Sequence, residues 1–211
     1  MKFSAPLCFL LLATALQSGV ALAERADRDK PMRIEADALR YDDAKQISVF
    51  TGKVMLAKGT MLIRGAQMDV RQDPSGNQYG VIKAEPGQLA FFRQKRDSAA
   101  GTPDEFMEGE AELIEYDGKA DSVKFLRRAV LRRYVGSRVN DEVTGAVIVF
   151  DNSTSILTVD GGPVTNVSDP RSGRVRAVLT PRVDDNAVPG TVPPVQSPAL
   201  RRSGAIGGDK K

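Results

Sequence analysis

The sequence contains no histidine and no tryptophan, and its single cysteine, Cys8, lies within the first 23 of 211 residues. Beyond that point imidazole catalysis, Ser-His-Asp and Cys-His nucleophiles, and metal sites built from His or Cys have no side chains to use. Carboxylates, lysine, tyrosine and hydroxyl groups are the only reactive groups left. The sequence therefore predicts a protein that is not an enzyme.

An acidic run is the remaining candidate for catalysis, because paired carboxylates can cleave glycosides. Glu108, Glu110 and Glu112 would share one face of a strand. Nothing in the sequence indicates the burial that would tune one of them as an acid, so a solvated strand face is the preferred interpretation. Calcium could bind at Asp42-Asp43, Asp151-Asn152 or Asp184-Asp185, but these pairs lack the spacing of an EF-hand loop and are expected to form turns. No metal site and no cofactor is predicted.

Residues 1–23 have the pattern of a secretory signal peptide. Lys2 precedes an apolar run from Leu7 to Leu16, and Ala21-Leu22-Ala23 gives an A-x-A cleavage site before Glu24. Cys8 is not at the cleavage junction, so a lipid-modified cysteine is not expected. The exported chain then has no thiol and no disulfide in an oxidising compartment.

Charge is balanced over residues 24–180, where Lys and Arg equal Asp and Glu in number. The basic pI of about 9.0 comes from the two ends of the chain. A balanced domain argues against nucleic acid as the main partner, because that affinity depends on neutralising many phosphates. One basic run, from Lys124 to Arg133, could hold phosphates of a lipid headgroup; a protected strand edge is the preferred alternative.

Short apolar alternations bounded by turn formers occur throughout residues 31–181, which predicts an all-β domain. Residues 24–30 are polar and are expected to form a flexible leader, and the Pro- and Gly-rich residues 182–211 a disordered tail. Neighbouring segments are predicted as separate short strands, as in these four pairs: 46–50 and 53–57, 60–64 and 67–71, 122–126 and 129–135, 141–144 and 146–150.

The chain resembles itself after a shift of 75 positions. Residues 36–42, ADALRYD, then lie over residues 111–117, AELIEYD, and Phe50 lies over Phe125. Such self-similarity is typical of stacked units that bury a face only against their neighbours. Chance similarity between short alternating segments is the alternative.

Eight apolar residues are expected to point inward and to line a slot between two sheet faces. A filled core and an open groove give the same alternation, so the sequence does not distinguish them. The eight residues are Met32, Ile34, Phe50, Phe91, Tyr116, Phe125, Ile148 and Phe150.

Three strings resemble the start of the OstA-like family of periplasmic lipopolysaccharide-transport proteins. They are PMRIEAD at 31–37, FTGKV at 50–54 and GTMLI at 59–63, and RVRAVLTP at 174–181 is similar to the family's last strand. Two departures are Leu126-Arg127-Arg128, where a Thr-Gly would repeat the first unit, and the polar segment 93–102.

The resemblance implies a twisted open β-jelly roll of stacked short antiparallel strands with an apolar interior groove. It implies a periplasmic subunit that binds lipopolysaccharide through its lipid A and conducts it from the inner to the outer membrane. The implied partners are an inner-membrane ABC-transporter complex, an outer-membrane translocon and further copies joined head to tail. The joining edges would carry Met32, Ile34 and Ala36 at one end and Val175, Ala177 and Leu179 at the other.

Two other classes stay open. An exported structural or adhesive β-repeat protein would assemble edge to edge without lipid. An exported hydrolase that uses Glu108 or Glu110 would need a measurable cleavage that is lost when either is changed.

Overall fold

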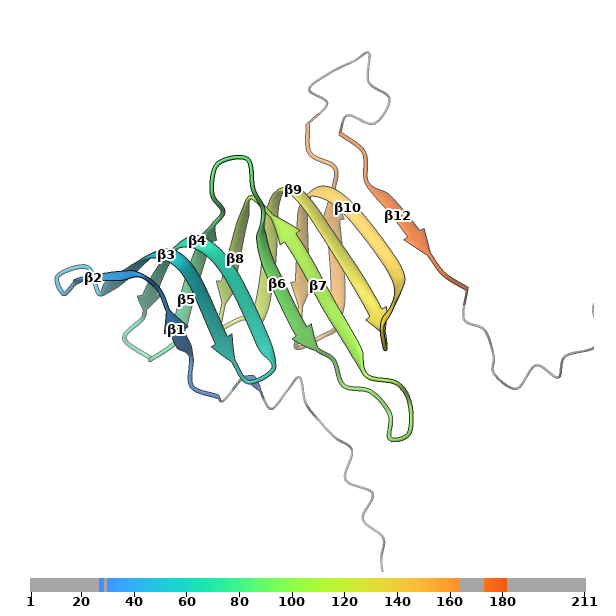
Figure 1. Cartoon of the computed structure of the whole chain (residues 1–211), viewed down its shortest axis with the longest axis horizontal. Helices are drawn as coiled ribbons and strands as arrows, with labels where there is room; N and C mark the ends of the chain where they lie inside the picture. The colour runs from blue at the N-terminus through green and yellow to red at the C-terminus, as the bar shows by residue number, and fades with distance from the viewer. Residues whose placement is uncertain (1–26, 29, 164–172, 182–211) are drawn as a thin grey trace, which may run out of the picture. The chain divides into compact units, whose positions relative to one another are not determined.

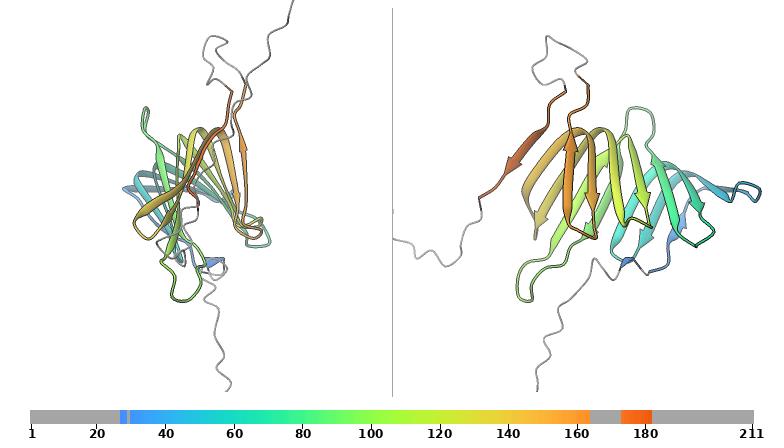
Figure 2. Two further views of the ribbon diagram at one scale, coloured as in Figure 1. Left: turned by 90° about the vertical axis from the view of Figure 1, so that its right-hand side faces the viewer. Right: turned by 180° about the vertical axis from the view of Figure 1, so that it is seen from behind.

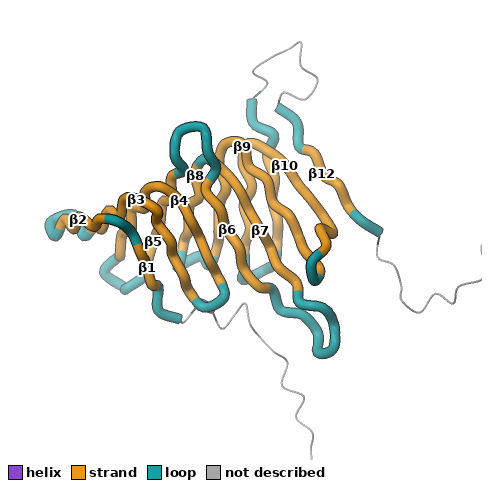
Figure 3. The backbone as a smooth tube through the Cα atoms, viewed as in Figure 1, coloured by secondary structure: helices purple, strands orange, loops and turns teal. Residues whose placement is uncertain are grey.

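The fold is known from a computed structural model that describes residues 27–28, 30–163 and 173–181. The predicted signal peptide and tail lie outside the described residues. Nearly all of the described chain is strand or short connecting loop (Figure 3). None of its helices is long and apolar enough to cross a membrane. The strands are β1 (Arg33–Glu35), β2 (Ala38–Asp42), β3 (Ile47–Lys58), β4 (Met61–Gln72), β5 (Gln78–Lys83), β6 (Ala90–Lys95), β7 (Glu105–Ala111), β8 (Leu113–Asp117), β9 (Ser122–Val135), β10 (Arg138–Asp151), β11 (Ile156–Asp160) and β12 (Arg176–Leu179).

The strands form one antiparallel sheet that bends over into two walls (Figures 1 and 2). The back wall has the pairing order β2-β3-β4-β5-β8-β9-β10-β11. The front wall has the order β1-β3-β4-β6-β7-β9-β10-β12. Strands β3, β4, β9 and β10 run through both walls and therefore join them.

The long strands change wall at irregularities in the ladder. Register shifts occur between Thr51 and Val54 of β3 and between Gly145 and Val147 of β10. In β9, Arg127 and Arg128 take positive φ angles of 62° and 52°. A bulge bends a strand without ending it. The four predicted pairs of short strands are wrong in this respect, because each pair is one bent strand.

The N-terminal joining edge, which the sequence assigns to Met32, Ile34 and Ala36, is not one continuous strand. Two short strands are present instead, and residues 36 and 37 separate them. β1 pairs with the front half of β3, and β2 pairs with its back half. Because β3 bends between its halves, one straight strand could not pair with both.

The internal repeat is preserved in the backbone. The amide of Asp37 donates to the Gly52 carbonyl at 3.0 Å, and the amide of Glu112 donates to the Arg127 carbonyl at 3.1 Å. Both members of this second pair lie 75 residues after those of the first. The two units therefore share the same bend despite the Leu126-Arg127-Arg128 departure.

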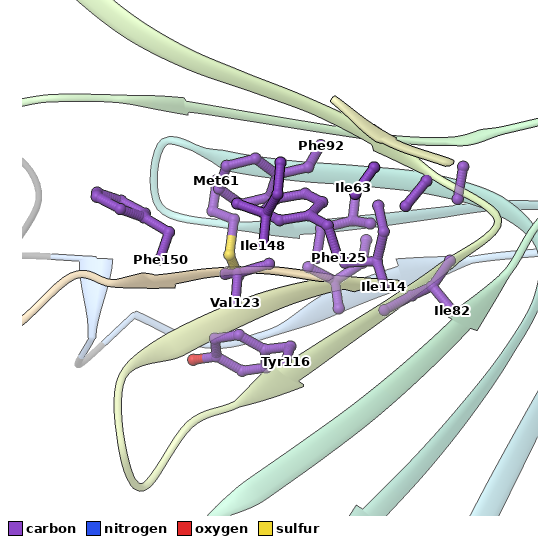
Figure 4. Packing of buried hydrophobic residues seen from close by; sticks show 14 of the residues in the cluster. Met61, Ile63, Ile82, Phe92, Ile114, Tyr116, Val123, Phe125, Ile148 and Phe150 are labelled. Atoms are coloured by element: carbon purple, nitrogen blue, oxygen red, sulfur yellow. The ribbon is translucent and has the colours of Figure 1, made fainter. Parts of the chain in front are cut away.

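The core lies between the walls and is built from rows of directly paired residues (Figure 4). A back-wall row is Phe50, Met68, Ile82, Ile114, Phe125, Ile148 and Val159. A front-wall row is Ile34, Leu56, Ile63, Phe92, Gly109, Leu131, Val143 and Ala177. Every strand except β2 thus contributes at least one residue to a continuous interior surface.

Candidate functional site

Seven of the eight residues predicted to point inward belong to this interior. Tyr116, Phe125, Ile148 and Phe150 are buried in the core. The remaining three are partly buried and pack against the core near its N-terminal end: Met32, Ile34 and Phe50.

The prediction is wrong for Phe91, which faces outward. Ala90, Phe92 and Gln94 are the buried residues of β6, so Phe91 lies on the opposite face of the strand. Its ring lies 4.9 Å from the Arg64 guanidinium on the outer surface. Because Phe91 and Phe92 are adjacent, their hydrophobicity does not decide which of them faces the core. Arg93 and Lys95 share a strand face with Phe91, and their charges were the signal that this face is the outer one.

Phe92 takes the interior position that the sequence assigned to Phe91. Its ring meets that of Phe125 edge to face, with centroids 5.4 Å apart and planes at 76°. Gly109 lies beneath this pair, and a Cβ there would overlap the Phe125 ring. The centre of the interior is consequently filled by side chains, as in an ordinary core.

Open pockets remain toward both ends of the interior. The N-terminal pocket has a volume of about 220 Å³, and its lining combines the apolar Met32, Ile34, Phe50 and Val70 with the polar Gln46, Ser48, Gln72 and Gln78. The C-terminal pocket has a volume of about 180 Å³. Its apolar lining consists of Met107, Leu131, Val143, Phe150, Leu157 and Leu179. Both pockets expose apolar surface that the hydrocarbon part of a ligand could contact.

The strands at the two ends of each wall have one free edge among the described residues. At the N-terminal end Leu39 and Tyr41 of β2 are 60% and 54% exposed. At the C-terminal end Val178 and Leu179 of β12 are 57% and 70% exposed. Of the predicted edge residues, Ile34 is in β1 and Ala177 and Leu179 are in β12, while Met32, Ala36 and Val175 lie just outside the strands.

The arginines of the basic run bind acids of this same chain. On the outer face of the front wall, Arg132 donates to Glu110 at 2.8 Å and to Glu142 at 2.7 Å. These bonds, led by that to Glu110, raise the pKa of Arg132. Arg93 pairs in the same way with Glu108 at 2.5 Å. The glutamates of this outer face are therefore paired with arginines of neighbouring strands.

Arg133 points to the other side of β9, into the C-terminal pocket. Its guanidinium pairs with Asp141 at 2.6 Å and with Glu105 at 3.5 Å. Asp141 also accepts a hydrogen bond from the Thr180 amide at 3.1 Å. Burial raises the pKa of Asp141, but the bonds from Arg133 and Thr180 outweigh it and hold the pKa below 3.8.

The walls also face each other along the side opposite their bends, where the 58–61 turn approaches the 117–122 turn. We call this side the seam. A polar cluster closes its middle: Asp27, Lys58, Gln94, Asp121 and Asn152 are all less than a tenth exposed. Asp27, which the sequence assigns to the leader, is thus one of the buried residues of this cluster. No group of three or more potential metal-ligating side chains occurs within the described ranges.

Antiparallel strands bent around an apolar interior that opens at its ends define an open β-jelly roll. Residues 33–156 match the family described as LptA/(LptD N-terminal domain) LPS transport protein, and the chain belongs to that family. The fold class and family expected from the sequence are therefore confirmed.

Curated relatives give the same result over most of their length. The lipopolysaccharide export system protein LptH of Pseudomonas aeruginosa is 28% identical over 84% of this chain and 94% of its own. LptA of Escherichia coli K12 is 29% identical over 76% of this chain and 84% of its own. Both are named as export system proteins and not as enzymes.

A solved structure shares the fold. The crystal structure of LptH from Pseudomonas aeruginosa is titled as the LptA homologous periplasmic component of the lipopolysaccharide transport device. It matches with a TM-score of 0.60 and 22% identity, over 74% of this chain and 99% of that chain.

Proposed function

We propose that this protein is a periplasmic lipopolysaccharide-binding bridge that passes lipopolysaccharide from the inner to the outer membrane. The observation that carries the proposal is the pair of unbroken apolar rows, from Phe50 to Val159 and from Ile34 to Ala177, inside a jelly roll of the transport family. In the structure described, an acyl chain could contact these rows at the two end pockets, and the walls would have to separate for it to contact the filled centre.

The physical need for such a path is large. Each methylene transferred to water costs about 0.8 kcal/mol, so a glycolipid with several acyl chains faces tens of kcal/mol if it crosses water unprotected. A binding surface removes this cost without any catalytic group. The N- and C-terminal pockets are the places where acyl chains would enter and leave the interior.

The same proposal includes the partners. The free edges of β1 and β2 at one end, and of β11 and β12 at the other, can each accept a further strand. A second copy joined head to tail, an inner-membrane ABC-transporter complex and an outer-membrane translocon would dock there. The apolar rows would then continue from one subunit to the next.

Photo-crosslinking tests the proposal. A photoreactive amino acid at Phe50 or Leu157, in the two end pockets, should capture lipopolysaccharide in cells. Phe91 is a matched control, because it is an aromatic residue of the same sheet that faces outward. Equal capture at Phe91 and Phe50 would contradict an interior path. Edge-to-edge assembly of a delipidated protein with no capture anywhere would instead favour a structural role.

A further inference from the structure

The carboxylate of Asp27 occupies a set of converging hydrogen-bond donors on the front wall. It accepts a bond from the Thr60 amide at 2.8 Å, a bond from the Thr60 hydroxyl, and one from Gln94 Nε2 at 3.3 Å. Gly59 allows this approach, since a Cβ there would overlap the Asp27 side chain. Gln94 itself is 2% exposed, so the donors are built into the fold.

The neighbouring residue contacts the opposite wall. Arg28 donates to the carbonyl of Lys119, in the β8–β9 turn, at 3.3 Å. Asp27 and Arg28 together therefore cross the seam. The space left between the walls at this point is about 10 Å³, against about 220 and 180 Å³ in the pockets on either side. The middle of the seam is thus closed by the leader.

Two acceptor oxygens in the closed seam, on Gln94 and Asn152, are not satisfied by any described donor. They are Gln94 Oε1 and Asn152 Oδ1, and both are buried. Lys58 lines the same space from the front wall, and its ammonium lies 5.7 Å from the ring of Tyr116 on the back wall. Buried orphan acceptors are costly, so this arrangement is built for more partners than it holds.

We propose that the donors around Asp27 form a binding site for the phosphate of an acylated glycolipid, filled here by the protein's own carboxylate. Binding of the phosphate displaces Asp27 and frees the seam. This inference rests on the proposed function, because it places a headgroup of the transported lipid at the surface of the apolar interior.

Charge and position favour this ligand. The Thr60 and Gln94 donors and the Lys58 ammonium suit an anion, and phosphate offers more acceptor oxygens than the single carboxylate it replaces. Asp121, the acid of the opposite wall, accepts a hydrogen bond from Asn152 Nδ2 at 3.2 Å and keeps its negative charge. The cations Arg28 and Lys58 of the same space offset that charge. The site also lies where the apolar interior meets solvent, which is where a lipid with buried acyl chains carries its phosphate. The hydroxyl and amine groups of the sugar would meet the orphan oxygens of Gln94 and Asn152.

The test uses the exported chain, residues 24–211, which has no cysteine. A fluorophore on Lys119→Cys reports the opening of the seam. The substitution keeps the contact with Arg28, because Arg28 binds the backbone carbonyl of residue 119 and not its side chain. The ligands are a lipid A-type acylated disaccharide with its phosphates, the same lipid without phosphates, and inorganic phosphate. The phosphorylated lipid should change the fluorescence, and Asp27→Asn should tighten its binding about fivefold by weakening the competing occupant. Glu115→Gln, an outer-face carboxylate paired with Lys124, is the matched control and should change nothing.

Each alternative result has one meaning. Equal affinity for the two lipids, unaltered by Asp27→Asn, would overturn the phosphate site while the lipid-binding function stands. A response to inorganic phosphate at the concentration at which the phosphorylated lipid acts would overturn the lipid as its source. Failure of every variant to bind either lipid would overturn the proposed function itself.

Discussion

Gly52 and Arg127 occupy equivalent positions in the two repeats and share a left-handed backbone, with φ angles of 81° and 62°. The Gly52 carbonyl accepts a hydrogen bond from the Asp37 amide. The Arg127 carbonyl accepts the equivalent bond from the Glu112 amide, one repeat further along the chain. Glycine adopts this conformation freely, whereas a side chain costs about 1 kcal/mol there. The second bend is therefore held by its surroundings and not by local preference; Arg127 also pairs with Glu112 at 3.1 Å.

Replacing Gly52 by alanine should destabilise the fold by about 2 kcal/mol or more, because strain and crowding add. The new Cβ would lie 2.8 Å from the Cβ of Asp37. Gly87 is a matched control with the same φ of 81° and no atom within 4 Å of a Cβ. Gly87→Ala should cost about 1 kcal/mol in urea unfolding. Equal losses for the two variants would show that crowding at the bend contributes nothing.

The two adjacent phenylalanines of β6 should respond very differently to truncation. Phe92→Ala removes a fully buried ring and its contact with Phe125, and should cost about 3–5 kcal/mol. Phe91→Ala removes an outer-face ring that stacks with Arg64 and should cost about 1 kcal/mol. Chemical denaturation measures both. A reversed order would mean that β6 presents its other face to the core.

The pairing of β12 should weaken in acid. Asp141 has a folded-state pKa below its usual 3.8, so it contributes stability above that value and loses it as pH falls through the lowered pKa. The protection factor of the Thr180 amide, which compares its exchange rate with the intrinsic rate at the same pH, should fall as the pH drops through this lowered pKa. Asp141→Asn should exchange faster at neutral pH and lose this acid dependence. An unchanged acid dependence in the variant would assign the effect to another carboxylate.

The free edge of β12 should be essential for self-association. The Thr180 amide bonds to Asn140 of β10, so by antiparallel alternation the Ala177 amide points away from β10. Ala177→Pro removes this outward donor and should shift the protein toward monomer in sedimentation, with little change in thermal unfolding. Val178→Pro removes an inward donor and should instead detach β12. Unaltered association of Ala177→Pro would exclude this edge as the contact.

Sequence patterns were sufficient for the interior wherever the alternation had one possible phase. Tyr116 lies between Glu115 and Asp117, and its inward position was predicted correctly. Phe91 and Phe92 are adjacent, so their own hydrophobicity could not decide which faces the core. The bends were also hidden, because turn formers such as Gly52 end strands in some contexts and only bend them in others.

The role of Asp27 could not be predicted for a different reason. Its partners Thr60 and Gln94 are 33 and 67 residues away in the chain, and the segment around it is polar throughout. Local composition is typical of a solvated leader. Only the closing of the sheet brings those donors to one place, so the contact is a property of tertiary structure.

The four strands shared by both walls determine how the interior could change its width. Because β3, β4, β9 and β10 are continuous, a rotation of one wall against the other would take place at the line of bulges that includes Thr51 to Val54 and Gly145 to Val147. Such a rotation needs no ladder hydrogen bond to break; it must overcome the packing of the central side chains and the polar contacts at the seam. The backbone of the four shared strands would thus serve as the hinge. The resistance to opening would come from the packed side chains of the core and the polar contacts of the seam, which lie away from the bulges.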